Sequence, residues 1–550
     1  MMNWKRKVAI FMVIVLILPL ILTDQTEAKK KVTKSKPSIS KKLTVVKGKK
    51  KTLKIKKVKS SKIKKTSWKT SNKKLKLSKK KKTSVVLQAK SVVKSKIKVT
   101  AKVILKTGKK YTLKCNVTVK AEKKVHPTPV PDTPVPNIPD TPNIPAQPTA
   151  TPDTREFPEA AAVPVPAKPQ SNSAFTDMVS ENSKYDLTEA LAADSVYEAY
   201  SKYFSIGAAI NGTSPGTSTA AAPEMRQVMK RHFNSTTLSN LMKPEYILDE
   251  EGCKANAAAG KNDTPALKFN SIVDNLDFCQ AAGIKMRGHV LVWHAQTPDW
   301  FFKEGFDSNA KFVDKATMKK RMGSYIRQVL EFCQKYYPGV IYCWDVVNEA
   351  ADDNSGVYRK NSNWYKTIGG EFVKCAFYYA RKYADPEVKL FYNDYNTFIS
   401  GKRARIIALT QELINLKLID GIGMQAYIGY EGEYPELSEI SDTVTRFGKL
   451  GLEVQLTELT YRVPDYNNVT EADYTQQGKN YEELMKMLVK LDKASGGPAE
   501  ITNVTFFGLM DEPYYIFGMN KTPDRDCWAR LFDRNLKMKP AYYGVMNAVK

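Results

Sequence analysis

The stretch Trp344-Asp345-Val346-Val347-Asn348-Glu349-Ala350 is an apolar run that ends in two polar residues. A second run of the same kind is Val454-Gln455-Leu456-Thr457-Glu458. Short β-branched, apolar runs are typical of buried parallel strands, so each glutamate stands where the carboxyl end of a strand opens onto a pocket. An Asn-Glu or Thr-Glu pair alone is more typical of a surface turn, and it is the motifs around these two pairs that favour the pocket instead.

Six further strand-like runs accompany these two, with helical patterns between them. Eight strand-then-helix units predict an α/β fold, the (β/α)8 or TIM barrel, over residues 175–550. In that fold the chemistry gathers at the carboxyl ends of the strands. The strand candidates are residues 204–210, 233–238, 286–293, 341–347, 390–393, 422–425, 454–456 and 504–507. The helical patterns include residues 318–336, 372–383, 403–416 and 474–491.

The charge of the chain is confined to one region. The 550 residues carry a formal net charge of +31, which by itself would favour nucleic acid or an anionic membrane as a partner. Residues 29–124, however, contain 38 lysines, no arginine and one acid, Glu122. Their net charge, 38 − 1 = +37, exceeds the +31 of the whole chain. The residues after them are therefore mildly acidic, and no nucleic-acid partner is predicted.

Apolar runs alternate with lysines at period two within this basic region. The pattern predicts a small all-β sandwich over residues 38–124 with Trp68 in its core, and it loosely resembles bacterial immunoglobulin-like modules. A disordered basic tail is the alternative, because dense lysines repel one another. The runs are residues 43–46, 52–55, 75–77, 85–87, 97–99 and 113–117.

Two segments flank the module. Residues 1–28 are typical of a secretory signal, with Lys5-Arg6-Lys7, an apolar stretch and a small-residue cleavage site. The apolar stretch is short for a bilayer span, so we expect a secreted protein with no stable span after cleavage, although an uncleaved anchor stays open. Proline recurs through residues 125–172, which predicts an extended linker between the module and the barrel.

The motifs of the barrel region, taken together, resemble glycoside hydrolase family 10, the retaining endo-1,4-β-xylanases. The resemblance runs from about residue 197 to residue 549. One such motif would be a weak signal, but the whole set follows the family order at predicted strand ends. The motifs are residues 287–294 (Arg-Gly-His-Val-Leu-Val-Trp-His), 297–300 (Thr-Pro-Asp-Trp), 344–350, 392–396 (Tyr-Asn-Asp-Tyr-Asn), 421–425 (Gly-Ile-Gly-Met-Gln), 456–458 and 539–542 (Lys-Pro-Ala-Tyr).

The resemblance implies that Glu349 is the general acid/base and Glu458 the nucleophile. The chemistry agrees, because retaining cleavage of a glycosidic bond needs two carboxyl groups about 5–5.5 Å apart, one to protonate and one to attack. Asn348 would bind the 2-hydroxyl of the reacting sugar. For His289 and Trp293, two of the other positions matched to the family, packing in the barrel core is the alternative. His294 is equally compatible with supporting a neighbouring site residue and with packing in the core. The matched positions that line the sugar subsites are Asn240, Lys243, His289, Trp293 and Gln425.

Five positions depart from the family pattern. Ser239 replaces a glutamate, Tyr427 a histidine and Thr460 an aspartate, while Phe507 and Tyr515 replace tryptophans. In the family, that histidine and aspartate form a relay that holds the nucleophile, so losing both together should leave no orphaned polar group. Our hypothesis is that the hydroxyl of Tyr427 donates directly to the nucleophile. The smaller aromatic wall should weaken binding of the reacting sugar or admit a different decoration of the substrate.

These observations predict a secreted retaining endo-1,4-β-xylanase that acts on xylan or a related β-1,4-linked polysaccharide. No cofactor is expected, because the carboxyl pair suffices, and no metal, because the seven cysteines lack metal-ligand spacing. One alternative is a related β-glycanase or glycosidase with shifted specificity, and another is a non-catalytic carbohydrate-binding barrel. The lysine-rich module would contact anionic wall polymers or uronic-acid-bearing xylan, retaining the enzyme at the surface, or serve as a solubilising spacer.

Overall fold

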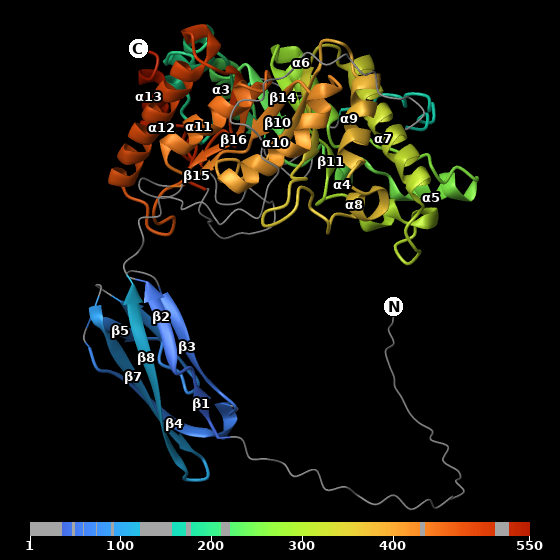
Figure 1. The fold of residues 1–550 in the computed structure, drawn as a ribbon. Coiled ribbons are helices and arrows are strands. Elements are labelled where there is room, and N and C mark those ends of the chain that lie inside the picture. Colours follow the sequence, from blue (N-terminus) through green and yellow to red (C-terminus); the bar gives the residue numbers. More distant parts are fainter. Residues whose placement is uncertain are drawn as a thin grey trace, which may run out of the picture. The chain divides into compact units, whose positions relative to one another are not determined.

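The structure is a computed structural model. It describes residues 36–46, 50–58, 60–72, 74–89, 93–120, 157–171, 178–210, 221–429, 435–511 and 527–550. The chain divides into two compact units, Met1–Pro145 and Ala146–Lys550, and each is described by itself (Figure 1). The predicted signal segment and most of the predicted linker lie outside the described residues. Within the described ranges, the helices are all too short or too polar to cross a membrane.

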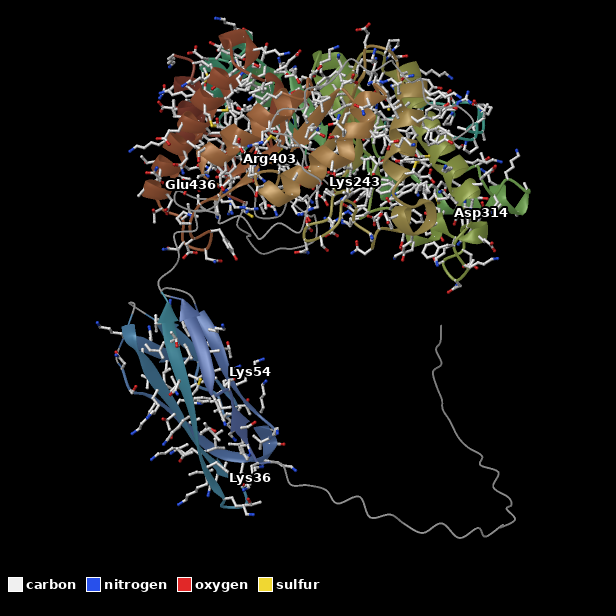
Figure 2. The ribbon with its side chains drawn as sticks, in the orientation of Figure 1. Lys36, Lys54, Lys243, Asp314, Arg403 and Glu436 are labelled. Atoms are coloured by element: carbon white, nitrogen blue, oxygen red, sulfur yellow. The ribbon has the colours of Figure 1, made fainter. Side chains whose placement is uncertain are left out.

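The first unit is a sandwich of two four-stranded sheets, which confirms the predicted all-β fold. Trp68 lies in its core, 4% exposed, and its indole N–H donates to the carbonyl of Lys81 (3.0 Å). Lysine side chains project from both sheets (Figure 2). One sheet has the order β1-β3-β6-β5 and the other β2-β8-β7-β4. The elements are β1 (Ser38–Ile39), β2 (Lys42–Val46), β3 (Lys50–Lys56), η1 (Ser60–Lys62), β4 (Ile63–Thr70), β5 (Leu75–Ser78), β6 (Ser84–Ala89), β7 (Val93–Leu105) and β8 (Lys110–Lys120).

The second unit contains a closed barrel of eight parallel strands, which confirms the predicted (β/α)8 fold. The strands follow one another around the barrel in chain order, and the pairings of β14 with β16 and of β17 with β9 close it. They are β9 (Ser205–Ile210), β10 (Ser235–Leu238), β11 (Lys285–Trp293), β12 (Ile341–Asn348), β13 (Lys389–Asp394), β14 (Gly421–Met424), β16 (Glu453–Tyr461) and β17 (Glu500–Phe506).

Helices surround the barrel, and several cover the outer face of the strands (Figure 1). Because both faces of the parallel strands are covered, β11 and β12 are buried along nearly their whole length. The α-helices are α1 (Thr188–Ala192), α2 (Val196–Ala199), α3 (Pro223–His232), α4 (Pro244–Ile247), α5 (Glu250–Ala258), α6 (Val273–Ala282), α7 (Lys315–Tyr336), α8 (Asn363–Ile368), α9 (Phe372–Tyr383), α10 (Ser400–Asn415), α11 (Leu437–Gly448), α12 (Glu471–Leu491) and α13 (Pro540–Asn547). Short 3-10 turns are η5 (Asp299–Phe302), η6 (Glu304–Phe306) and η7 (Lys493–Ser495).

All eight predicted barrel strands are present, and the seventh and eighth are longer than predicted. The seventh strand, β16, continues to Tyr461 because a short strand, β15 (Tyr427–Ile428), pairs with its far end. In that pairing Tyr427 lies opposite Thr460. The extension therefore brings Tyr427 close to the predicted nucleophile two residues earlier on β16.

The last part of the predicted linker, residues 157–171, packs against the barrel, and this corrects the sequence-based boundary. Phe157 is 2% exposed and stacks on Tyr378 of α9, with ring centroids 4.5 Å apart. The hydroxyl of Tyr379 donates to the carbonyl of Pro158 (2.6 Å). Proline-rich composition predicted an extended spacer, but a buried aromatic ring and several hydrogen bonds hold this stretch on the helices.

Candidate active site

Of the two predicted catalytic glutamates, Glu349 lies at the carboxyl end of a barrel strand, and Glu458 lies near the end of another, three residues before β16 ends at Tyr461. Glu349 directly follows β12, and its backbone N–H donates to the carbonyl of Asn393 on β13 (2.9 Å). Its φ of 57° is in the left-handed region, which is uncommon for a residue other than glycine. Glu458 lies on β16 and is 7% exposed. Both residues are therefore placed by the strands, as the sequence predicted.

One amide network joins the two glutamates. Gln425 donates to Oε1 of Glu349 (2.8 Å), and its amide also lies 3.3 Å from that of Asn348. The amide of Asn348 lies 3.1 Å from that of Asn393, which in turn reaches Oε1 of Glu458 (3.4 Å). A chain of three amides thus connects the side chain of Glu349, which contacts Gln425, to that of Glu458, which contacts Asn393. The sequence did not single out Asn393 as a site residue, although its motif was part of the family resemblance.

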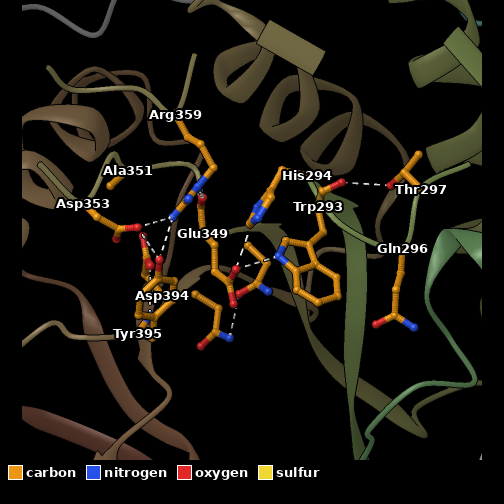
Figure 3. A network of polar contacts seen from close by, with 12 residues as sticks. Trp293, His294, Gln296, Thr297, Glu349, Ala351, Asp353, Arg359, Asp394 and Tyr395 are labelled. Carbon is orange, nitrogen blue, oxygen red and sulfur yellow. Dashed lines mark hydrogen bonds and ion pairs between the residues drawn. The ribbon is translucent and has the colours of Figure 1, made fainter. Parts of the chain in front are cut away.

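Three side chains surround the carboxyl group of Glu349 (Figure 3). The indole N–H of Trp293 donates to Oε2 (2.8 Å), and Gln425 donates to Oε1 (2.8 Å). Nδ1 of His294 lies 3.7 Å from Oε2. Burial lowers the pKa of His294, which favours the neutral ring at pH 7. His294 is thus a neighbour of Glu349 rather than a residue of the barrel core.

Glu458 has a buried environment with a direct tyrosine donor. The hydroxyl of Tyr427 donates to Oε2 of Glu458 (2.5 Å), which confirms the hypothesis drawn from the missing relay. Burial raises the pKa of Glu458, and the charge of Glu349 adds to that effect. The charge of His289, the hydrogen bond from Tyr427 and the charge of Lys243 all favour the ionised form and oppose the rise.

A buried ion pair orients His289. Nδ1 of His289 lies 2.9 Å from Oδ2 of Asp345, and Arg287 donates to both oxygens of the same carboxylate (2.9 and 2.7 Å). Burial would raise the pKa of Asp345, but Arg287 and His289 hold it below its usual value. Arg287 also donates a hydrogen bond to Oε1 of Gln455 (2.6 Å), which links the ion pair to β16. The roles of Arg287 and Asp345 were not predicted, although an arginine and an aspartate within apolar strands could have indicated them.

A second polar cluster lies around Lys243. Its ammonium group donates to Asn240 (3.1 Å) and Gln296 (2.8 Å), and it lies 4.6 Å from the ring centroid of Trp293. Burial lowers the pKa of Lys243 to about 8, while the charges of Glu458 and Glu349 oppose the shift. The structure therefore brings Asn240, Lys243 and Trp293 together as predicted. Gln296 was not predicted, and the hydroxyl of Ser239 is buried with no hydrogen-bond partner in the described part of the chain.

The structure describes four of the five positions that depart from the family pattern. Phe507 is 6% exposed and packs edge-to-face on Tyr427, with ring centroids 6.0 Å apart. Tyr515 lies outside the described residues. The expectation that no polar group would be orphaned is wrong, because the hydroxyl of Thr460 is buried and has no partner among the described residues. A strand fixes the direction of this short side chain, so it cannot turn toward a distant acceptor.

The sequence profile described as Glycosyl hydrolase family 10 matches residues 195–548. The chain is 47% identical over 313 residues to a putative endo-1,4-beta-xylanase of Caldicellulosiruptor saccharolyticus, covering 56% of this chain and 96% of that relative. It is 40% identical over 353 residues to endo-1,4-beta-xylanase B of Butyrivibrio fibrisolvens, covering 64% of this chain and 52% of that relative. The chain thus spans nearly all of the first relative and about half of the second.

Solved structures of two bacterial xylanases resemble the barrel. Xylanase B from Clostridium stercorarium F9 is 29% identical, with a TM-score of 0.55 over 64% of this chain and 100% of its own. The N-terminal CBM22-1–GH10 modules of xylanase 10B from Clostridium thermocellum, solved with xylohexaose, are 30% identical with a TM-score of 0.56. That match covers 64% of this chain and 68% of the other.

Proposed function

Because the chain belongs to glycosyl hydrolase family 10, we propose that its barrel is a retaining endo-1,4-β-xylanase that hydrolyses internal β-1,4-xylosidic bonds of xylan. The main structural support is the convergence of Glu349 and Glu458 on one amide network at the strand ends. Two carboxyl groups delivered to one place are what a double displacement at a sugar carbon requires.

The reaction proceeds in two steps. In the first, the carboxylate of Glu458 forms a bond to the anomeric carbon while Glu349 protonates the departing glycosidic oxygen, and the bond between that oxygen and the carbon breaks. In the second, Glu349 takes a proton from water, the water oxygen bonds to the anomeric carbon, and Glu458 leaves as a carboxylate. Asn348, held between Gln425 and Asn393, is placed to hold the sugar 2-hydroxyl, a contact that strengthens in the transition state.

Product analysis on xylan tests this function. The enzyme should release short xylo-oligosaccharides from within the polymer, and the new reducing ends should first appear in the β configuration. A product that first appears as the α anomer would contradict the retaining mechanism. Release of single sugars from chain ends only would contradict the endo mode of action.

A related β-glycanase or glycosidase with shifted specificity is the second candidate. The buried, unpartnered hydroxyl of Ser239 favours it, because a charged acceptor for sugar hydroxyls is absent at that position. Phe507 adds to this, since it offers less stacking area than tryptophan. Comparing kcat/KM on xylan, β-glucan and aryl glycosides separates the candidates, because a glucan-preferring enzyme would reverse the expected order.

Replacing Tyr427 by phenylalanine should move the acid limb of kcat/KM to higher pH. The nucleophile must be ionised, so activity falls as the pH drops through the pKa of Glu458. The hydrogen bond from Tyr427 favours the ionised form, and its loss raises that pKa further above the usual range. The pH profile of kcat/KM on a soluble xylo-oligosaccharide measures the shift.

The control for this variant is Tyr543→Phe, which removes a hydroxyl from an exposed tyrosine on α13. It should keep the pH profile of the unaltered enzyme. An unchanged acid limb in Tyr427→Phe would mean that the short contact to Glu458 does not set the ionisation of the nucleophile.

The lysine-rich module is proposed to hold the enzyme on anionic polymers of the cell surface, after export directed by residues 1–28. Across the paired strands of the described module, lysines stand opposite residues of other types, as in Lys98 opposite Asn116 and Lys102 opposite Thr112. Like charges directly opposite each other destabilise a sheet, so this pattern lets a dense positive surface fold. Trp68 is buried, which leaves charge rather than aromatic stacking as the main means of contact.

Binding to wall material should weaken at least about tenfold when the ionic strength rises from about 0.05 to 0.5 M, because exposed charges are screened. Removing residues 29–124 should abolish this binding and leave the activity on soluble xylan unchanged. Pull-down assays with purified wall polymer, acidic xylan and neutral xylan identify the partner. Stronger retention on acidic xylan would assign the module to the substrate instead, and salt-independent binding would contradict a charge-based contact.

A further inference from the structure

The backbone of Glu349 is held from outside its own strand by an arginine. Nε of Arg359, in the loop that follows β12, donates to the carbonyl of Glu349 (3.0 Å). The backbone N–H of Arg359 also donates to the carbonyl of Ala350 (2.8 Å), so one residue holds two successive carbonyl groups. A left-handed backbone at a residue other than glycine is strained and persists only where the surroundings enforce it. Arg359 is part of those surroundings.

The guanidinium group of Arg359 is itself fixed by a cluster (Figure 3). Nη2 donates to Oδ2 of Asp353 (3.1 Å) and to the hydroxyl of Tyr395 (2.8 Å), and that hydroxyl donates to Asp353 (2.5 Å). Lys402, on α10, donates to Oδ1 of Asp353 (2.9 Å) and to the carbonyl of Ala351 (2.8 Å). Burial raises the pKa of Asp353, but the hydrogen bonds from Tyr395 and Lys402 and the nearby cations bring it down to about 2. The carboxyl group of Asp353 therefore stays ionised at neutral pH.

We propose that Arg359 is a positioning residue for the general acid. Together with Asp353 and Tyr395 it fixes the backbone of Glu349, so that the carboxyl group meets the leaving oxygen of the substrate. Arg359 contacts the backbone of Glu349 and acts through it, which separates its role from that of a catalytic residue. Placement matters because a displacement of about 1 Å at a reacting group costs roughly a hundredfold in rate. The inference rests on the proposed xylanase function.

The variant Arg359→Met tests this role, because it keeps a long side chain and removes the guanidinium group. With the acid misplaced, kcat on xylan should fall about 10–100-fold while KM changes little. An aryl xylobioside with a nitrophenolate-type leaving group needs little protonation, so its kcat/KM, which reports the first step, should fall by less than about threefold. A loss confined to the proton-requiring substrate distinguishes misplacement of the acid from general damage to the fold.

Three companion variants make the test decisive. Arg381→Met breaks a comparable arginine–aspartate pair, with Asp420 (2.5 Å), and should leave both substrates unaffected. Tyr395→Phe removes the two hydrogen bonds of the tyrosine hydroxyl but keeps the guanidinium group, and should show the same substrate selectivity with a smaller loss. Arg359→Lys keeps the charge but not the forked geometry, and should recover part of the loss on xylan.

Equal losses on both substrates in folded Arg359→Met, or full activity on xylan in both Arg359→Met and Tyr395→Phe, would overturn the inference. If Arg359→Met does not fold, Tyr395→Phe alone decides, through the same ratio of losses. Assays of the unaltered enzyme on both substrates distinguish a failure of this inference from a failure of the proposed function. An unaltered enzyme that cleaves neither substrate refutes the function, whereas an active one with insensitive variants refutes only the role of Arg359.

Discussion

Replacing Glu458 by glutamine is expected to reduce kcat on xylan by at least about 10⁴-fold, the scale on which removal of an enzymic nucleophile acts. The amide has nearly the same shape, so Tyr427 and Asn393 keep their neighbour, but it cannot form the bond to the anomeric carbon. Reducing-sugar release measures the loss. Binding of a xylo-oligosaccharide, measured by calorimetry, should persist because the subsite residues are untouched.

The matched control is Glu453→Gln, at the amino end of the same strand. It should retain the turnover of the unaltered enzyme. Thermal unfolding of both variants should stay within about 3 °C of the unaltered protein, which corresponds to roughly 1 kcal/mol for a domain of this size. An inactive unaltered enzyme that still binds xylan would support the non-catalytic alternative. Turnover in Glu458→Gln above about 1% of normal would remove Glu458 from the role of nucleophile.

Replacing Glu349 by alanine should lower kcat on xylan by about 10²–10⁴-fold, the usual contribution of general acid–base catalysis. The first step on an activated aryl xyloside should be nearly unaffected, because its leaving group departs without a proton. Hydrolysis of the glycosyl-enzyme should then become slow, since no base activates water. Stopped-flow detection of the released phenolate should show a burst followed by slow turnover.

Azide provides the second measurement on Glu349→Ala. Its nitrogen attacks the anomeric carbon of the glycosyl-enzyme without a base, and the bond to Glu458 breaks to release a carboxylate. Turnover of the aryl substrate should therefore rise with azide, and the product should be the β-glycosyl azide. An α-glycosyl azide, or equal losses on activated and natural substrates, would contradict the assignment of Glu349. The control Glu387→Ala, at an exposed position, should behave as the unaltered enzyme.

The barrel could be predicted because its strands are buried on both faces and so appear as β-branched runs. The same runs located Glu349 and Glu458, since each glutamate follows such a run within one or two residues. The direct bond from Tyr427 to Glu458 could be predicted because two departures from one pattern had to compensate each other. The orphaned hydroxyl of Thr460 could not, because it depends on the direction in which β16 presents a short side chain.

Supports that depend on contacts between distant loops were beyond the reach of the sequence. Arg359 and Asp353 are ordinary charged residues of a loop, and nothing in their spacing shows that Tyr395 joins them. The pairing of Arg287 with Asp345 depends on the register of β11 against β12, which apolar patterning does not specify for buried parallel strands. Residues of this kind hold other site residues in place and so determine much of the geometry of the site. Only a three-dimensional structure reveals them.

The stacking of Phe157 on Tyr378 determines where this protein can be divided. A catalytic fragment that starts at residue 175 would leave the face of Tyr378 open to water, at about 25 cal/mol for each Å² exposed. It would also present neighbouring apolar rings on one surface, which favours self-association. A catalytic fragment should therefore start at or before Phe157 to keep this contact.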